Sequence, residues 1–467
     1  MGFKWTTLGK FIKVQGGYAY RSKDFISSGN NRVLKIKNIR FGSVDYDDTV
    51  FIRDELASAT CQYKTKPKDV LISMTGSGPN APNSLVGRVA RIREDEPEAW
   101  INQRVGRLEL IEEKSISLDF VYYLLTEKKA QDFLVSNSSG SANQANISGK
   151  TIESLPCPNV SFSESKNISQ ILLSFDNKIQ LNNQINQTLE AMAQAIFKSW
   201  FVDFDPVRAK HKVFDRGGSF EDGERAAMRV ISSKTDEQLD EMVKSQSDEF
   251  AKLQLKASLF PSKLVDSELG EIPAGWKVST IDKSYEVIMG QSPKGETYNE
   301  NGNGTLFYQG RAEFGWRFPS PRLYTTDPKR MAKQGDVLMS VRAPVGDLNI
   351  ALNNCCVGRG LCALRHRSNS TSYSYYQFRD IKGKLDIYNG EGTVFGSVNQ
   401  KTLKSIEIIE PESKIIQAFT AVVVKIDEQI RSLTQQNQSF AELRDTLLPK
   451  LLSGELDVSG LVEMQDD

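Results

Sequence analysis

The sequence predicts an α+β chain with an internal pseudo-two-fold duplication. Two tandem α+β domains are each followed by a long helix, and the two helices pack as an antiparallel coiled coil. The first observation is a seam of mostly apolar residues at alternating steps of four and three, from Ile168 to Trp200 and again from Phe419 to Leu451. These steps are the heptad pattern of a coiled coil. The second observation is that both seams share one register at an offset of 251 residues, which indicates duplicated halves.

Shorter segments repeat outside the seams. The matching pairs are Ile147–Leu155 with Val398–Ile406, Asp69–Ser73 with Asp336–Ser340, Val105–Arg107 with Val357–Arg359, and Trp5 with Trp276. The offset falls from 271 at the tryptophans to 251 at the helices. The repeated unit is therefore a whole domain with its helix, because solenoid repeats have much shorter periods.

These repeats divide the chain into six segments. We expect a first domain over residues 1–160, a first helix over 161–202, a charged linker over 203–270, a second domain over 271–410, a second helix over 411–456 and a tail over 457–467. The linker has no counterpart in the other half, and its charged part predicts one or two surface helices.

Within each domain, short β-rich runs alternate with Gly-, Asn- and Ser-containing turns. In the first domain we expect strands around Arg32–Ile36, Asp69–Ser73, Val86–Ile92 and Val105–Ile111, and one helix over Leu118–Leu134. In the second domain we expect strands around Leu306–Gln309, Val337–Val341 and Leu348–Leu352, and a helix around Tyr373–Leu385.

Composition excludes several classes of function. The 467 residues carry no net charge, which is against indiscriminate coating of nucleic acid but allows a local basic face. No apolar run reaches the ~18 residues that span a membrane. Five cysteines and two histidines lack the spacing of a metal site. Reduced thiols and a cytoplasmic location are the simplest interpretation.

The sequence contains no recognisable catalytic motif. Gly149-Lys150-Thr151 lacks the earlier glycine of a phosphate-binding loop, and we interpret it as the strand entry before the first long helix. No Asn/Asp-Pro-Pro-aromatic tetrapeptide, by which amino-methyltransferases grip a flipped base, is present. Two histidines also leave little for general acid–base chemistry. We therefore expect a non-catalytic protein with no catalytic residues, no bound metal and no cofactor of its own.

Basic and polar residues gather in loops of both domains. Arginine and lysine neutralise phosphates, while arginine, asparagine and glutamine can read base edges. The candidate DNA contacts are Arg21, Lys23, Lys35, Lys37, Asn38 and Arg40 in the first domain, and Lys294, Tyr308, Gln309, Arg311, Arg317 and Arg322, beside Trp316, in the second. The alternative is that any protein surface carries such residues.

The chain resembles the specificity subunits of type I restriction–modification systems. The resemblance covers essentially the whole chain and rests on four segments: Glu268-Leu-Gly-Glu-Ile-Pro-Ala-Gly-Trp276, Gly290-Gln-Ser-Pro293, Lys198-Ser-Trp-Phe-Val-Asp-Phe-Asp-Pro206, and Asp427–Ile430 with Leu447–Leu456. It implies two target-recognition domains that each bind half of a bipartite double-stranded DNA target. It also implies two methyltransferase subunits carrying S-adenosylmethionine, and two restriction subunits using ATP and Mg.

Two rival functions stay open. One is a specificity subunit of a modification-only or atypical system, and the other is a coiled-coil scaffold that binds proteins without DNA.

The helices are the expected spacer between the domains. The first seam covers 33 residues, or about 50 Å at 1.5 Å per residue. We expect Asn186 and Asn437 to face each other and hydrogen-bond, which would fix the register. The other expected contacts in the seam are Ile179, Leu189, Ile430 and Phe440. Pro449, where the first helix has Lys198, could kink or end the second helix early.

Overall fold

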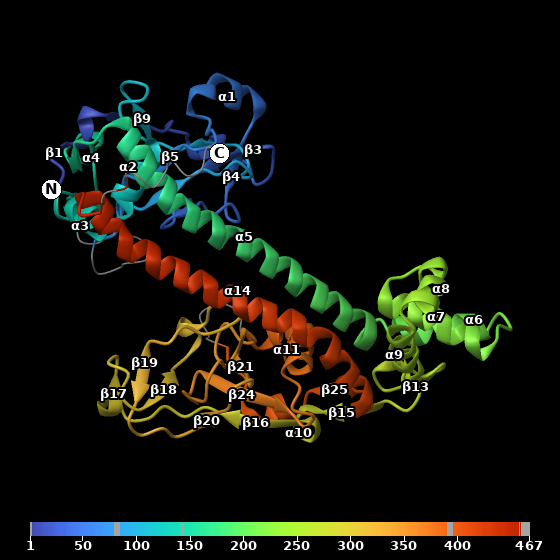
Figure 1. Cartoon of the computed structure of the whole chain (residues 1–467). Coiled ribbons are helices and arrows are strands. Elements are labelled where there is room, and N and C mark those ends of the chain that lie inside the picture. The colour runs from blue at the N-terminus through green and yellow to red at the C-terminus, as the bar shows by residue number, and fades with distance from the viewer. Residues whose placement is uncertain (1, 79–84, 142–143, 390–395, 457, 459–467) are drawn as a thin grey trace. The chain divides into compact units, whose positions relative to one another are not determined.

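The structure is a computed structural model. It describes residues 2–78, 85–141, 144–389, 396–456 and 458. The predicted tail at 457–467 therefore lies almost wholly outside the described residues. Contacts divide the chain into two compact units, one formed by residues 1–183 and 435–467 and the other by residues 184–434. Each unit contains one β-rich domain and a part of both long helices (Figure 1).

The first domain has two main sheets, and also a two-stranded sheet of β1 and β12 and a three-stranded sheet in the order β10-β11-β6. The main sheets differ in strand direction. One is four-stranded and antiparallel, in the order β2-β9-β5-β7. The other, in the order β4-β3-β8, pairs β3 with β8 in parallel. The strands are β1 (Trp5–Thr7), β2 (Ile12–Gly16), β3 (Asn31–Leu34), β4 (Val50–Ile52), β5 (Val70–Ser73), β6 (Thr75–Gly76), β7 (Val89–Arg91), β8 (Ala99–Ile101), β9 (Val105–Leu110), β10 (Ser139–Ser141), β11 (Gln144–Asn146) and β12 (Pro156–Pro158).

The second domain repeats this plan. Its four-stranded sheet has the order β16-β24-β21-β22, and its five-stranded sheet, β17-β19-β18-β23-β20, pairs β18 with β23 in parallel. The strands are β15 (Lys277–Thr280), β16 (Tyr285–Met289), β17 (Tyr298–Asn299), β18 (Thr305–Tyr308), β19 (Leu323–Thr325), β20 (Met331–Ala332), β21 (Val337–Ser340), β22 (Leu348–Ile350), β23 (Cys355–Val357), β24 (Leu361–His366) and β25 (Glu407–Glu410).

Strand β5 shows why these runs become strands. All four of its residues are buried, and successive side chains point to opposite faces of a sheet. Val70 and Ile72 therefore join the core that contains the domain's helices, whereas Leu71 joins a separate cluster on the other face. In β21, Val337 and Met339 likewise join one hydrophobic cluster, and Leu338 joins another.

Strand pairing confirms the duplication and corrects two of the matches. Leu8 donates its N–H to the carbonyl of Leu155, and Ile281 donates to that of Ile406. Leu8 and Ile281 are therefore equivalent, so the counterpart of Trp276 is Phe3 rather than Trp5. Trp5 is 55% exposed, which agrees with this correction. The match of Val105–Arg107 with Val357–Arg359 is also wrong, because Val105 pairs with Ser73 whereas Ser340 pairs with Leu361.

Each predicted domain helix is a pair of shorter helices. The first is α2 (Leu118–Thr126) followed by α3 (Lys128–Ser136), and the second is α11 (Thr371–Asp380) followed by α12 (Lys382–Asp386). Glu127, with extended dihedral angles, separates α2 from α3. The serines Ser117 and Ser370 cap α2 and α11 by accepting a backbone N–H, so the two helices begin at equivalent positions.

The segments that precede the two long helices match as predicted. Residues Gly149–Glu153 form the short helix α4, capped by Ser148, and Gln400–Lys404 form α13, capped by Asn399. The Gly-Lys-Thr tripeptide thus begins a capped helix, rather than the predicted strand entry. The strands β12 and β25 follow these helices.

The two long helices are α5 (Phe162–Phe201) and α14 (Ser413–Ser453). Within the first unit, the Phe175 and Phe440 rings lie 6.1 Å apart, and Asn182 donates to Asn437 at 2.9 Å. Within the second unit, Asn186 lies 3.4 Å from the hydroxyl of Thr434. As the residue number rises along α5, the number of the residue it contacts on α14 falls, which confirms the antiparallel packing. Pro449 lies inside α14, which continues to Ser453, so the predicted early end is wrong.

The predicted bond between Asn186 and Asn437 is replaced by two different contacts. In an antiparallel pair, each step forward on one helix is matched by a step backward on the other. Asn437 meets Asn182, and also donates to Asn183 at 2.8 Å. Asn186, four residues beyond Asn182, consequently meets Thr434. The other expected seam residues are buried or half-buried: Ile179, Leu189, Ile430 and Phe440.

The linker is a helical subdomain, in place of the one or two surface helices predicted. It contains α6 (Asp205–Phe214), α7 (Phe220–Ser232), α8 (Asp236–Ser245) and α9 (Ser247–Ser258), and a hairpin of β13 (Leu264–Ser267) and β14 (Gly270–Pro273) leads to the second domain. The helices enclose a small core that includes Met228 and Leu239. Lys210 and Glu224 form a buried ion pair beside it. The charge-based prediction missed these apolar positions.

Candidate nucleic-acid interface

The parallel strand of each domain leads into the same kind of loop. After β3, a 3-10 turn over Ile36–Asn38 is followed by a narrow loop closed by a bridge between Ile39 and Val44. After β18, a turn over Arg311–Glu313 is followed by a loop closed between Phe314 and Pro319. We call these the tip loops, residues 39–44 and 314–319.

The two tip loops present an aromatic side chain at equivalent positions. Phe41 stands two residues after Ile39, and Trp316 two residues after Phe314. They are 54% and 50% exposed. An exposed aromatic ring in a nucleic-acid-binding domain can stack on a base or insert between bases. The sequence prediction missed Phe41, which could have been found only by aligning the two loops.

Most candidate contacts of the first domain are exposed. Arg21, Lys23, Lys37 and Arg40 lie at the surface, and Lys35 is half-buried. Two of them are paired with local acids: Lys37 with Asp48, and Arg40 with Asp45 at 3.0 Å. Burial and the neighbouring charge of Lys37 lower the pKa of Lys35, whose amine lies 4.0 Å from the Phe25 ring centre.

Asn38 has a different position from the one predicted. Its side chain is 1% exposed and donates to the carbonyls of Asp45 and Asp48 at 2.9 and 3.0 Å. It also accepts the Lys35 N–H. Asn38 therefore ties the start of the tip loop to the segment that follows, in place of the predicted DNA contact.

The second domain follows the same pattern. Lys294, Gln309, Arg311 and Arg322 are exposed, and Arg311 pairs with Asp347 at 2.9 Å. Tyr308 is 2% exposed, and burial raises the pKa of its hydroxyl. It packs in the core on one face of the sheet, so it supports the loop instead of making the predicted DNA contact.

Arg317 departs furthest from the prediction, because it is 1% exposed. Its guanidinium donates to Glu190 on α5 and to Asp427 on α14, and its Cζ lies 4.5 Å from the Tyr375 ring centre. Arg379 donates to Glu190 as well, at 2.6 Å. Arg317 thus fastens its tip loop to both helices, in place of a DNA contact. A charged residue in a basic loop gives no signal in the sequence that distinguishes these two roles.

The first unit has a related but different ion pair. Asp176 of α5, equivalent to Asp427, accepts from Arg444 of α14 at 2.7 Å and from the Tyr123 hydroxyl at 2.6 Å. One hydrogen bond at equivalent positions joins each domain to its long helix. Ser117 bonds Ser169 at 3.1 Å, and Ser370 bonds Thr420 at 2.6 Å.

Comparison with known proteins now places the chain. A sequence model described as "Type I restriction modification DNA specificity domain" matches residues 2–191 and 273–439, which is one match in each half of the chain. The chain belongs to the family of type I restriction–modification specificity subunits. The unmatched residues between the two segments include the helical subdomain.

Relatives of the same family share most of the chain. It is 31% identical over 360 residues to the type I restriction enzyme HindI specificity subunit of Haemophilus influenzae, covering 72% of this chain and 77% of that one. It is 22% identical over 488 aligned positions to the MjaIX specificity subunit of Methanocaldococcus jannaschii, covering 98% and 97%. The fold is similar to the S subunit of M. genitalium, with a TM-score of 0.51, 14% identity and 96% of each chain covered.

Family membership makes the chain a non-catalytic, DNA-binding part of a type I restriction–modification complex. In the described part of the chain, no group of histidine, cysteine or acidic residues is arranged to hold a metal. No described helix is long and apolar enough to cross a membrane. Burial raises the pKa of the Cys157 and Cys355 thiols to about 12, so both stay protonated at neutral pH.

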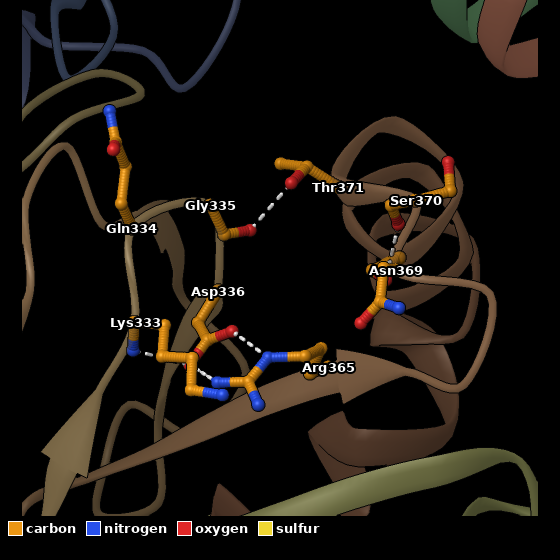
Figure 2. Close-up of a pocket in the computed structure, with 9 residues that line it drawn as sticks. Lys333, Gln334, Gly335, Asp336, Arg365, Asn369, Ser370 and Thr371 are labelled. Atoms are coloured by element: carbon orange, nitrogen blue, oxygen red, sulfur yellow. Dashed lines mark hydrogen bonds and ion pairs between the residues drawn. The ribbon is translucent and has the colours of Figure 1, made fainter.

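One polar pocket of about 180 Å³ lies within the second domain, between β21, β24 and α11. Figure 2 shows two of its three charged residues turned toward each other: Arg365 donates twice to Asp336, at 2.6 Å each, and Lys333 is the third. Thr371 donates to the carbonyl of Gly335 across the opening. Because these groups satisfy one another, we assign the pocket a structural role for this specificity subunit.

Proposed function

We propose that the chain reads a bipartite double-stranded DNA target, with one half contacted by each domain. The observation that carries this proposal is the repeated tip loop, which presents Phe41 in one domain and Trp316 in the other at equivalent, exposed positions. Two readers of one design on one chain suit a target with two separated halves.

The basic residues that supply the phosphate contacts are all exposed, except for the half-buried Lys35. In the first domain these are Arg21, Lys23, Lys35, Lys37 and Arg40. In the second they are Lys294, Arg311 and Arg322, and the exposed, neutral Gln309 can read a base edge. Pairing with nearby acids such as Asp45 and Asp347 holds several of these side chains in place. It also keeps non-specific attraction to DNA low, in accord with the zero net charge.

The two long helices set the distance between the half-sites and dock two methyltransferase subunits, which carry S-adenosylmethionine. In the full complex, two restriction subunits supply the ATP- and Mg-dependent activities. The names of the relatives, type I restriction enzyme specificity subunits, support this assignment. A modification-only system, without the restriction subunits, is the second candidate.

A domain exchange tests the proposal. Residues 1–160 are replaced by the equivalent segment of a relative with a different target, and host DNA is sequenced for methylation. Only one half of the modified sequence should change, because the domains act as separate readers. The matched control exchanges the second domain, residues 271–410, and should change only the other half.

Two results would contradict the proposal. If each exchange altered both halves, the domains would not be independent. If the reconstituted chain and methyltransferase subunits showed no affinity for duplex DNA in a gel shift, the coiled-coil scaffold would be the better interpretation.

A further inference from the structure

Gly42 in the first domain is the structural counterpart of Arg317 in the second. The tip-loop bridges, Ile39 with Val44 and Phe314 with Pro319, align the two loops residue by residue. The backbones of Gly42 and Arg317 also hydrogen-bond to equivalent strands of their domains. Gly42 donates its N–H to Val89 of β7, and Arg317 accepts at its carbonyl from Ile350 of β22. The first half therefore lacks the side chain that fills this place in the second half.

In the second half, the guanidinium of Arg317 sits among tyrosines and acids. It lies over Tyr375, donates to the Tyr376 hydroxyl at 3.0 Å and pairs with Asp427. The helix caps Ser117 and Ser370 align Tyr122 with Tyr375 and Tyr123 with Tyr376. Most of the groups that receive Arg317 are thus repeated in the first half, with Asp176 in the place of Asp427.

These repeated groups line a pocket of about 520 Å³ in the first unit. An added Cβ at Gly42 would lie 3.4 Å from the Tyr122 hydroxyl, so a side chain at this position would point into the pocket. The lining residues are Phe41, Gly42, Tyr122, Tyr123, Thr126, Glu127, Lys128, Asp176, Arg444, Asp445, Leu448 and Pro449.

The Tyr122 side chain gives a second, independent indication of a ligand. It is only 7% exposed, yet within the described ranges its hydroxyl has no hydrogen-bond partner. The hydroxyl lines the pocket, so it is available to a ligand there.

The chemistry of the lining favours a cation. Three acidic residues, Glu127, Asp176 and Asp445, stand against two basic ones, Lys128 and Arg444. Arg444 already donates to Asp176 and to Oδ1 of Asp445, so the acceptor that the Asp445 carboxylate still offers is Oδ2. Pro449 has no N–H, so it cannot donate to the carbonyl of Asp445, four residues earlier. That carbonyl is a further acceptor at the pocket. Phosphate is disfavoured because the acids repel it.

We propose that this pocket binds the guanidinium of an arginine side chain presented by a protein partner. The inserted arginine takes the place of Arg317 beside the tyrosines only, because Arg444 already pairs with Asp176 as Arg317 pairs with Asp427. The guanidinium plane of the inserted arginine stacks on Tyr122. Its N–H groups donate to the Tyr122 hydroxyl, to Oδ2 of Asp445 and to the Asp445 carbonyl. The Asp176–Arg444 pair stays in place as one wall. The second half needs no such partner, because its own chain supplies the arginine.

The test is a titration of the purified full chain, followed by saturation-transfer NMR. The probe is N-acetyl-L-arginine amide, which resembles an arginine within a protein. We expect a dissociation constant on the order of 1 mM. Three comparison probes are N-acetyl-L-lysine amide, free L-arginine and inorganic phosphate. Lysine should bind more weakly because its ammonium cannot stack or donate in one plane. Free arginine should also bind more weakly, because its carboxylate approaches Glu127 and Asp445.

The decisive variant is Thr126→Arg. Thr126 is exposed at the last position of α2 and is the counterpart of Arg379, so the new arginine fills the pocket from the chain itself. Arginine is also favourable at a helix C-terminus. Binding of the probe should weaken by at least about tenfold. The matched control is Ser136→Arg, an exposed residue at the last position of α3 that does not line the pocket. It should leave binding within about twofold.

A second variant, Asp445→Asn, removes one acidic group at the surface and should weaken binding several-fold. Equal affinity of the wild-type chain and Thr126→Arg would overturn the proposal. So would lysine binding as tightly as arginine, or free arginine binding more tightly than the amide, which would indicate an amino-acid ligand. Phosphate binding that Thr126→Arg strengthened would point to a nucleic-acid contact instead.

Discussion

Replacing Arg317 with alanine should loosen the second domain from its helices. The change removes a guanidinium that is 1% exposed and leaves Glu190 and Asp427 without it. Breaking a buried ion pair from one side costs about 3–5 kcal/mol, because a charge stays buried without its partner. Lost stacking on Tyr375 adds to this. Arg379 still pairs with Glu190, so the lower part of that range is expected.

Hydrogen exchange measured by mass spectrometry can detect this loss locally. Peptides from α11 should exchange roughly 100-fold faster in the variant, since 1.36 kcal/mol corresponds to a factor of ten. Peptides from α2 in the first unit should keep their rates and serve as an internal reference. The matched control is Arg311→Ala in the same segment, whose exposed pair with Asp347 is worth at most about 1 kcal/mol.

The loss of stability in Arg317→Ala should also depend on pH. Burial already raises the pKa of Asp427, and Arg317 opposes this. Without Arg317 that pKa rises further, so the folded variant binds a proton that the unfolded chain releases. Stability contributed by such a raised pKa is present at low pH and lost as pH rises through the folded value. The free energy of unfolding that Arg317→Ala loses relative to the wild-type chain should therefore be smaller at pH 5 than at pH 8. If Arg317→Ala and Arg311→Ala behaved alike, Arg317 would not anchor the domain.

Three further predictions follow from the helices and from the family. Asn437→Leu should lower the free energy of unfolding by about 1–3 kcal/mol in urea titrations, because the Asn182 amide is buried and loses its partner. The double variant Asn182→Leu/Asn437→Leu should recover most of that free energy, and failure to recover it would argue against the Asn182–Asn437 hydrogen bond. A matched insertion of seven residues in α5 and α14 adds about 10 Å and should lengthen the gap between methylated half-sites by about three base pairs; an unchanged gap would exclude the helices as the ruler. The chain alone should transfer no methyl group from S-adenosylmethionine to DNA, and labelled product would refute this.

The residue pattern alone was enough to predict the α+β halves, their duplication and the antiparallel helices. Heptad steps and alternating apolar residues report which faces of local elements are buried, and 251 residues of offset were visible without any structure. The linker shows the limit of this reasoning. Its charged residues predicted a solvated segment, whereas Met228 and Leu239 meet only when four short helices pack together.

The candidate site was predictable only in part. Most of the basic residues that the sequence singled out are exposed, and their contact with DNA stays a prediction. Burial of Asn38, Tyr308 and Arg317 depends on contacts with residues far along the chain, such as Glu190 and Asp427 for Arg317. The pairing of Asn437 with Asn182 likewise depends on helix direction and register together. Sequence spacing measures positions along one element, but these contacts join elements whose relative placement is set by packing.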